Sequence, residues 1–219
     1  MLWLLAAAVL CCGIMSIVDG VIRPNYWIKS AVKLLLFLGV PFLMSRRLEQ
    51  LRFGVLFRFR VKAFLPALGL GLGLYLLILL AYWLVTSLNL FDFSGIAGQL
   101  SSNAGVHRGN FLFVSLYISF VNSLLEEFFF RGFLFMSLKR VSSRPFAYGF
   151  SAAAFALYHM GMVSGWFSPL LYLLVMVGLV AGGVIFNFLN EKQETIYTSW
   201  LVHMFVNFAI NTIGFQLMA

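Results

Sequence analysis

The residues VNSLLEEFFFRG, at positions 121–132, place two adjacent glutamates inside a long apolar run, and an arginine follows four positions after the second glutamate. The chain around them has 219 residues, of which 62% are hydrophobic and only 10% are charged. Soluble domains carry about 25% charged residues, and a single soluble core of this size could not bury so much apolar surface. The composition therefore indicates an integral membrane protein, in which these two carboxylates stand where water is scarce.

Seven apolar runs approach or exceed the length of about 20 residues that crosses the hydrocarbon core of a membrane. They lie at 2–18, 27–44, 63–88, 111–138, 146–160, 168–189 and 196–218. The run at 146–160 is short, so we expect it to be partly re-entrant or shielded by its neighbours. The first run lacks the basic start and the cleavage site of a signal peptide. We predict an all-α, polytopic membrane helix bundle of about seven transmembrane helices, forming one domain over 1–219.

The net charge of +8 comes mainly from basic residues that cluster between the apolar runs. The two richest segments are the loop 45–62 and the turn 139–144. Cytoplasmic loops carry such an excess, which predicts a cytoplasmic N-terminus and a C-terminus outside. The loop 45–62 interleaves arginine with leucine and phenylalanine, which favours an amphipathic segment at the membrane surface. We expect membrane lipids as partners of this charge, and no nucleic acid.

Polar residues inside the apolar runs are the first candidates for function. A charged group at the centre of a membrane helix costs about 2.5–3.5 kcal/mol and usually faces a bundle interior or a wet cavity. Glu127 and Arg131 are four residues apart, so they share a helix face and can pair. Glu126 has phenylalanine at 130 and asparagine at 122, so it has no basic partner one turn away. Glu126 therefore needs a partner from another helix.

Two histidines and an asparagine are the candidates for that partner. His203 and Asn207 project from one face of the last run, and His159 lies near the end of the short run. Glu126 is near the middle of its own run, so the three depths meet only if helices tilt or the short run is embedded off-centre. Each group also has a structural interpretation: an ion pair, a histidine bonded to a carbonyl, or interhelical hydrogen bonds. A proton relay through Glu126 in a small transporter is a further alternative.

Three motifs in this order resemble those of a known family. EEFFFR at 126–131, FALYH at 155–159 and HMFVN at 203–207 are similar to the motifs of the CAAX-prenyl-endopeptidase and bacteriocin-processing family, also called Abi. Members are intramembrane proteases of the glutamic type. The resemblance covers about 111–211 and marks this part as the catalytic core. The helices within 1–110 show no assignable motif and would be a variable N-terminal part.

The resemblance implies a role for each matching residue. Glu126 would be the catalytic carboxylate, and His159 would help it to bind and activate a water molecule. His203 and Asn207 would form an oxyanion site, and Glu127 and Arg131 would support the site through their ion pair. This chemistry is coherent, because amide hydrolysis needs a base for water, a donor for the oxyanion and an acid for the leaving amine.

The resemblance implies an intramembrane endopeptidase that acts on a membrane-anchored or hydrophobic-tailed protein or peptide, in a bacterial or archaeal plasma membrane. Two histidines and one glutamate could also hold zinc with an open position for water. The chain has no H-E-x-x-H, and its two histidines come from different runs, so we favour hydrolysis without a metal or cofactor. The alternative function is that of a non-catalytic immunity or scaffold protein of the same family.

Overall fold

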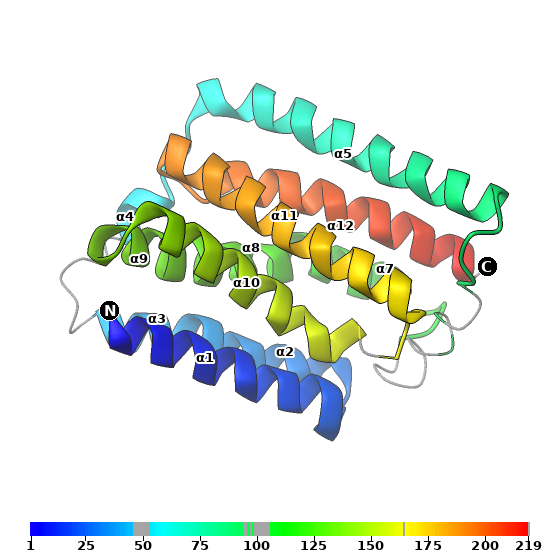
Figure 1. Cartoon of the computed structure of the whole chain (residues 1–219), viewed down its shortest axis with the longest axis horizontal. Helices are drawn as coiled ribbons and strands as arrows, with labels where there is room; N and C mark the ends of the chain where they lie inside the picture. Colours follow the sequence, from blue (N-terminus) through cyan, green and yellow to red (C-terminus); the bar gives the residue numbers. More distant parts are fainter. Residues whose placement is uncertain (46–52, 94–95, 97, 99–105, 164, 219) are drawn as a thin grey trace.

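The computed structural model describes residues 1–45, 53–93, 96, 98, 106–163 and 165–218. Regular structure in these residues is helical throughout, and the long helices lie alongside one another in a bundle (Figure 1). The first half of the chain supplies α1 (Leu2–Ile17), η1 (Val18–Ile22), α2 (Tyr26–Leu34), η2 (Leu35–Gly39), α3 (Val40–Ser45), α4 (Phe53–Leu56) and α5 (Val61–Ser87), where η marks a π-helix.

The second half contains the segment that opened the sequence analysis. It supplies α7 (Phe111–Tyr117), η3 (Ile118–Asn122), α8 (Ser123–Glu126), η4 (Glu127–Phe135), α9 (Met136–Val141), α10 (Arg144–Val163), α11 (Pro169–Gln193) and α12 (Tyr197–Leu217). The pieces from α7 to α9 form one continuous helical segment, Phe111–Val141, and so do the pieces from α1 to η1 and from α2 to α3. The predicted all-α, polytopic bundle is confirmed.

Six helical segments of the described chain are long and apolar enough to cross a membrane. They are Leu2–Ile22, Tyr26–Ser45, Val61–Ser87, Phe111–Val141, Arg144–Val163 and Pro169–Gln193. The seventh long helix, α12, is not among these six, and its sequence carries a histidine and two asparagines. The chain is therefore an integral membrane protein, and its described residues form six apolar spans in a bundle of seven long helices.

The expectation of a short fifth run was wrong. Helix α10 has 20 residues, which is a full crossing length. It begins at Arg144 and continues past His159 to Val163, because neither the arginine at its start nor Gly161 near its end interrupts the backbone hydrogen bonds. In the loop 45–62, residues 46–52 lie outside the described residues. The remainder contains the short α4, after which Phe57 and Phe59 are exposed.

The two ends of the chain lie at opposite ends of the bundle (Figure 1). The basic turn between α9 and α10 and the start of α5 lie at the same end as the N-terminus. Seven long helices of the described chain, which run in alternating directions along the bundle, place the two termini at opposite ends. Which end faces the cytoplasm stays a prediction from the charge distribution.

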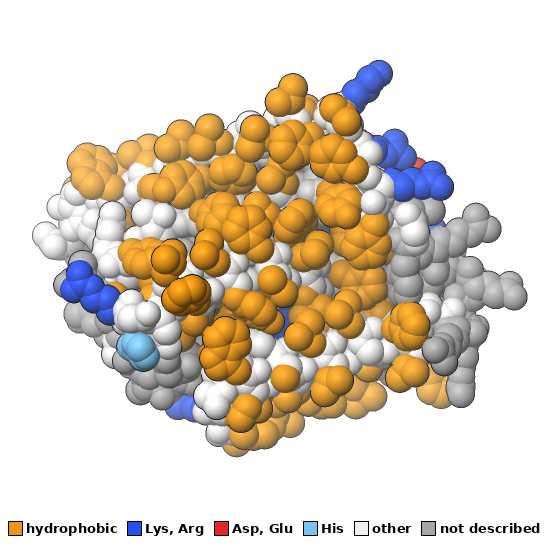
Figure 2. Space-filling model, turned by 180° about the vertical axis from the view of Figure 1, so that it is seen from behind, with side chains coloured by type: hydrophobic (Ala, Val, Ile, Leu, Met, Phe, Trp, Pro, Cys, Tyr) orange, Lys and Arg blue, Asp and Glu red, His pale blue; other side chains and the backbone are white. Residues whose placement is uncertain are grey.

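Burial shows which helical segment is central. In the most apolar part of Phe111–Val141, 50% of the residues are buried, whereas only 11% are buried in that of Pro169–Gln193. Exposed leucines, valines and phenylalanines cover the outer helices, and Figure 2 shows them as a broad apolar field across one face. The segment Phe111–Val141 is therefore enclosed by its neighbours, and the outer helices present apolar side chains to lipid.

Small residues let helices approach closely around this segment. A Cβ atom on Gly183 of α11 would lie 2.9 Å from the Cα atom of Ala152 in α10. A Cβ atom on Gly161 of α10 would lie 3.0 Å from the carbonyl oxygen of Ser16 in α1. Such contacts are how membrane helices pack without a hydrophobic driving force between them. They fix α10, and with it His159, between the first and sixth spans.

Candidate active site

The segment that carries both glutamates is not a uniform α-helix. Two π-helical stretches, η3 and η4, stand on either side of α8. Hydrogen bonds in a π-helix run over five residues, and such turns are frequent at functional sites. Glu126 is the last residue of α8, and Glu127 is the first residue of η4. Their exposed fractions are 2% and 0%, so both carboxylates lie within the bundle.

The two oxygens of Glu126 have different surroundings. Oε1 lies 2.5 Å from Nζ of Lys33, which α2 contributes, and it accepts a hydrogen bond of 2.9 Å from Nδ2 of Asn122. Oε2 faces the Nε2 atoms of His159 and His203, at 3.8 and 3.6 Å. Both distances exceed that of a direct hydrogen bond. One oxygen is therefore held by donors, and the other faces two ring nitrogens without a direct hydrogen bond to either.

The hydrogen bonds of the two rings indicate which nitrogens carry protons. Nδ1 of His159 lies 2.7 Å from the carbonyl oxygen of Phe155. A carbonyl oxygen can only accept, so this Nδ1 carries a proton and Nε2 of the neutral ring has a lone pair. Nδ1 of His203 lies 2.9 Å from Oε1 of Glu127, an ionised acceptor, so the same assignment holds there. Both Nε2 atoms that face Glu126 are thus acceptors when the rings are neutral.

Glu127 links a second buried cation to this group. Its Oε1 lies 3.3 Å from Nη1 of Arg131, so the pairing expected from their spacing is confirmed. The guanidinium of Arg131 is fully buried, and its carbon lies 4.1 Å from the ring centre of Phe155 and 5.0 Å from that of Phe186. Its three nitrogens have no hydrogen-bond partner among the described residues. The ion pair and the aromatic faces therefore hold this cation.

Asn207 lies one turn beyond His203 in α12, as expected. Its Nδ2 donates to the carbonyl oxygen of Ile118 in η3, over 3.3 Å. An amide nitrogen has two donor hydrogens, so one remains for another acceptor. Asn211, one further turn on, donates to the carbonyl oxygen of Ser115 and to the hydroxyl of Ser119. These bonds attach α12 to the glutamate-bearing segment.

The structure thus brings Glu126, His159 and His203 together, with Glu127 and Arg131 beside them and Asn207 one turn away. The catalytic roles given to these residues stay predictions. Sequence reasoning looked for the partner of Glu126 among the histidines and missed Lys33, whose ammonium makes the shorter contact. The sequence signal was Lys33 itself, which lies about one turn and a half into the apolar run 27–44. A lysine inside a membrane helix needs an acidic partner, just as Glu126 needs a basic one.

A zinc ion held by Glu126, His159 and His203 does not fit this arrangement. In the part of the chain that is described, no group of three or more His, Cys, Asp and Glu side chains could hold a metal ion. The ammonium of Lys33 lies 2.5 Å from the carboxylate that would be a ligand, and it would repel a divalent cation at close range.

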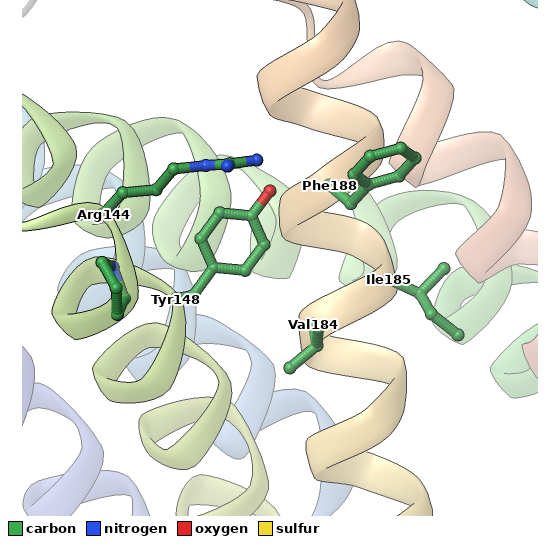
Figure 3. A pocket seen from close by; sticks show the side chains of 6 residues that line it. Arg144, Tyr148, Val184, Ile185 and Phe188 are labelled. Carbon is green, nitrogen blue, oxygen red and sulfur yellow. The ribbon is translucent and has the colours of Figure 1, made fainter.

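One hollow of the molecule lies away from this cluster. It is on the outside of α10 and α11 (Figure 3), and its lining residues are Arg144, Pro145, Tyr148, Val184, Ile185 and Phe188. None of these is one of the predicted site residues. In Figure 3 the side chains of Arg144 and Tyr148 lie close together, near the end of α10 at which the basic turn enters. We therefore assign the candidate site to the buried cluster and not to this hollow.

Comparison with known proteins agrees with the motifs. Residues 108–209 match the family model described as "Type II CAAX prenyl endopeptidase Rce1-like". The match contains Glu126, His159, His203 and Asn207, and it leaves Lys33 outside. Neither the curated proteins nor the solved structures yield a match. The resemblance seen in the sequence is thereby confirmed: residues 108–209, a little under half of the chain, are similar to the Rce1-like CAAX prenyl endopeptidases, a family of peptide hydrolases.

Proposed function

We propose that this protein is an intramembrane endopeptidase that hydrolyses a peptide bond of a membrane-associated substrate, using a water molecule activated by Glu126 and His159. One observation carries the proposal: Oε2 of Glu126 and the Nε2 atoms of His159 and His203 converge, and all three are acceptors when the rings are neutral. Three acceptors cannot bond to one another. A water molecule supplies two donor hydrogens and keeps a lone pair for attack.

In the proposed reaction, this water donates one hydrogen to Oε2 of Glu126 and the other to Nε2 of His159. As the water oxygen bonds to the carbonyl carbon of the substrate, its proton moves to Glu126, which acts as general base. The carbonyl oxygen becomes an oxyanion. The tetrahedral intermediate then collapses, the C–N bond breaks, and Glu126 returns the proton to the leaving amine. The products are a carboxylic acid and an amine, so Glu126 ends as it began.

The oxyanion needs donors, and His203 and Asn207 are placed to supply them in this proposal. In this proposal His203 takes up a proton from solvent when the substrate binds, donates from Nε2 to the oxyanion as an imidazolium that Glu127 beside Nδ1 stabilises, and returns the proton when the products leave. Asn207 offers the amide hydrogen that Ile118 does not take. Arg131 fixes Glu127, so the ion pair supports the site through His203 and does not touch the substrate.

We propose that the reaction uses no metal and no other cofactor, because the ammonium of Lys33 contacts Oε1 of Glu126 and would repel a divalent cation bound to that carboxylate. Exhaustive chelation of the purified protein should leave its rate of cleavage unchanged. Loss of cleavage that zinc restores would contradict this part of the proposal.

For the substrate we propose a peptide or protein with a prenylated or otherwise hydrophobic tail, which would reach the site from the lipid. The matching family model names a CAAX prenyl endopeptidase, and the outer helices present apolar side chains. The N-terminus would face the cytoplasm, where the basic end of the bundle would contact anionic lipid head groups.

The experiment is cleavage of a fluorogenic peptide that ends in a prenylated CAAX sequence, by the full chain in proteoliposomes. We expect cleavage by the wild-type chain. The Glu126→Gln variant keeps the size of the side chain but removes the base, and it should lose cleavage while remaining folded. Undiminished cleavage by that variant would refute the assignment.

A further inference from the structure

Lys33 joins the site from outside the segment that matches the family. It lies in α2, and the match begins at residue 108. Its Nζ is 2.5 Å from Oε1 of Glu126 and 2.5 Å from Oδ1 of Asn122. The side chain is 6% exposed, and the ammonium lies 4.8 Å from the ring centre of Tyr158. This lysine is therefore enclosed and held by an acid, an amide and an aromatic face.

The cluster is neutral only when Lys33 is counted. Glu126 and Glu127 contribute two formal negative charges, and Arg131 and Lys33 contribute two formal positive charges, when both histidine rings are counted as neutral. Without Lys33, a buried carboxylate would stand uncompensated among apolar helices, and such a group is neutralised by taking up a proton. A protonated Glu126 could not act as a base.

Lys33 also separates the tasks of the two carboxylate oxygens. Together with Asn122 it occupies Oε1, and the oxygen that faces His159 and His203 is the other one. A carboxylate without this anchor could rotate about its last bond and exchange the two oxygens, since that bond has a broad torsional preference. The anchor gives the base a fixed direction.

We propose that Lys33 is a positioning residue of the site, which keeps Glu126 ionised and holds Oε1 so that Oε2 faces the histidines. The N-terminal helices, which carry no family motif, thereby contribute to the reaction. The role in catalysis rests on the proposed function, whereas the charge state of Glu126 can be measured without any substrate.

Infrared difference spectroscopy of the purified protein measures that charge state. The bands of Glu126 are identified by subtracting the spectrum of Glu126→Gln from that of the wild type at neutral pH. In the wild type we expect a carboxylate band. In Lys33→Met, compared with Lys33→Met/Glu126→Gln, we expect a protonated carboxyl band in its place. A carboxylate band in both backgrounds would overturn the proposal.

The pH dependence of cleavage is the second measurement. The titratable or charged groups near Glu126 are Lys33 and Tyr26 of α2, His159 and Tyr158 of α10, His203 of α12, and Glu127 and Arg131 of η4. Removing the cation at Lys33 makes ionisation of Glu126 harder, so in Lys33→Met the acid limb of the pH–rate profile should move to higher pH. Cleavage at neutral pH should fall roughly tenfold or more. An unmoved acid limb would contradict the proposal.

Matched variants separate this role from packing. Lys33→Arg keeps the charge and should restore the wild-type acid limb, at least in part. Lys29, about one turn earlier in α2, pairs with Asp19 at 3.1 Å, so Lys29→Met should leave the acid limb unchanged. A shift in Lys29→Met as large as that in Lys33→Met, or no rescue by arginine, would show that the lysine acts through general stability.

Two further outcomes keep the tests distinct. If Lys33→Met is too unstable to purify, the double variant Lys33→Met/Glu126→Gln should be more stable than Lys33→Met alone, because a glutamine is neutral without the free-energy cost of protonating a carboxylate at neutral pH. A double variant that is less stable would overturn the pairing. Cleavage by Glu126→Gln would refute the proposed function, whereas wild-type infrared bands in Lys33→Met would refute only the role of Lys33.

Discussion

Glu126 and Glu191 both contact cationic side chains, but of the two only Glu126 has a carboxylate oxygen without a hydrogen-bond donor among the described residues. Glu191 lies near the end of α11, at the basic end of the bundle. Its Oε1 is 3.0 Å from Nζ of Lys139 and 3.0 Å from Nε of Arg144. Its Oε2 accepts from Nη2 of Arg144 at 2.8 Å and from the hydroxyl of Tyr148 at 2.6 Å. Donors therefore occupy both oxygens of Glu191, whereas donors occupy only one oxygen of Glu126.

The difference separates a structural carboxylate from one suited to chemistry. Arg144 donates two hydrogen bonds to Glu191, one from Nε and one from Nη2, and such a bidentate ion pair is strong and has a specific geometry. The second oxygen of Glu126 instead faces His159 and His203 at distances longer than a direct hydrogen bond. Burial alone does not make this distinction. The two histidine nitrogens that face the undonated oxygen of Glu126 do, since the buried Oε2 of Glu127 also lacks a donor among the described residues. The following predictions compare the buried cluster with matched residues outside it.

The largest expected effect on stability is at Arg131. Arg131→Met leaves the buried carboxyl group of Glu127 without its cation, which should cost about 3–5 kcal/mol of stability. Arg144→Met removes an exposed partner of Glu191 and should leave the unfolding midpoint close to that of the wild type. Denaturant unfolding in one detergent measures both. Equal shifts in the two variants would show that burial of the pair does not govern its contribution.

The histidines should have the next largest effect. His159→Ala and His203→Ala should each lower the cleavage rate about 10²- to 10³-fold, the size seen when one preorganised catalytic group is removed. His107 is exposed, and His107→Ala should cleave like the wild type. Rates are measured with the prenylated CAAX peptide in proteoliposomes. A wild-type cleavage rate in His159→Ala would refute the proposal that His159 binds the attacking water molecule.

The smallest effect is expected at Asn207. Asn207→Ala removes one of two oxyanion donors, so cleavage should slow about tenfold. Asn211 donates to Ser115 and Ser119 and has no place in the mechanism. Asn211→Ala should therefore lower stability without changing the rate per folded molecule. A slower cleavage rate in Asn211→Ala with an unchanged rate in Asn207→Ala would show that the oxyanion site lies one turn further along α12.

Spacing along single helices was enough to predict part of this site. Glu127 and Arg131 pair as expected although η4 is a π-helix, because residues four apart remain on neighbouring positions of one face. The shared face of His203 and Asn207 in α12 likewise follows from a local period. The helix count followed from the lengths of the apolar runs.

Contacts between distant helices were harder to predict. The ends of α10 could not be placed from hydropathy, because its first and last residues are not strongly apolar, and this made His159 seem too shallow to reach Glu126. Lys33 is 93 positions from Glu126, and no local rule joins residues so far apart. The π-helical turns have no sequence signature, since they are set by how neighbouring helices pack.

The most direct test of the central claim compares the two glutamates in one assay. Glu126→Gln and Glu191→Gln are reconstituted at equal folded protein and given the prenylated CAAX peptide. We predict that Glu126→Gln loses cleavage by about 10²- to 10⁴-fold or more, as expected for removal of a general base, and that Glu191→Gln cleaves like the wild type. Cleavage at the wild-type rate by Glu126→Gln would contradict the account.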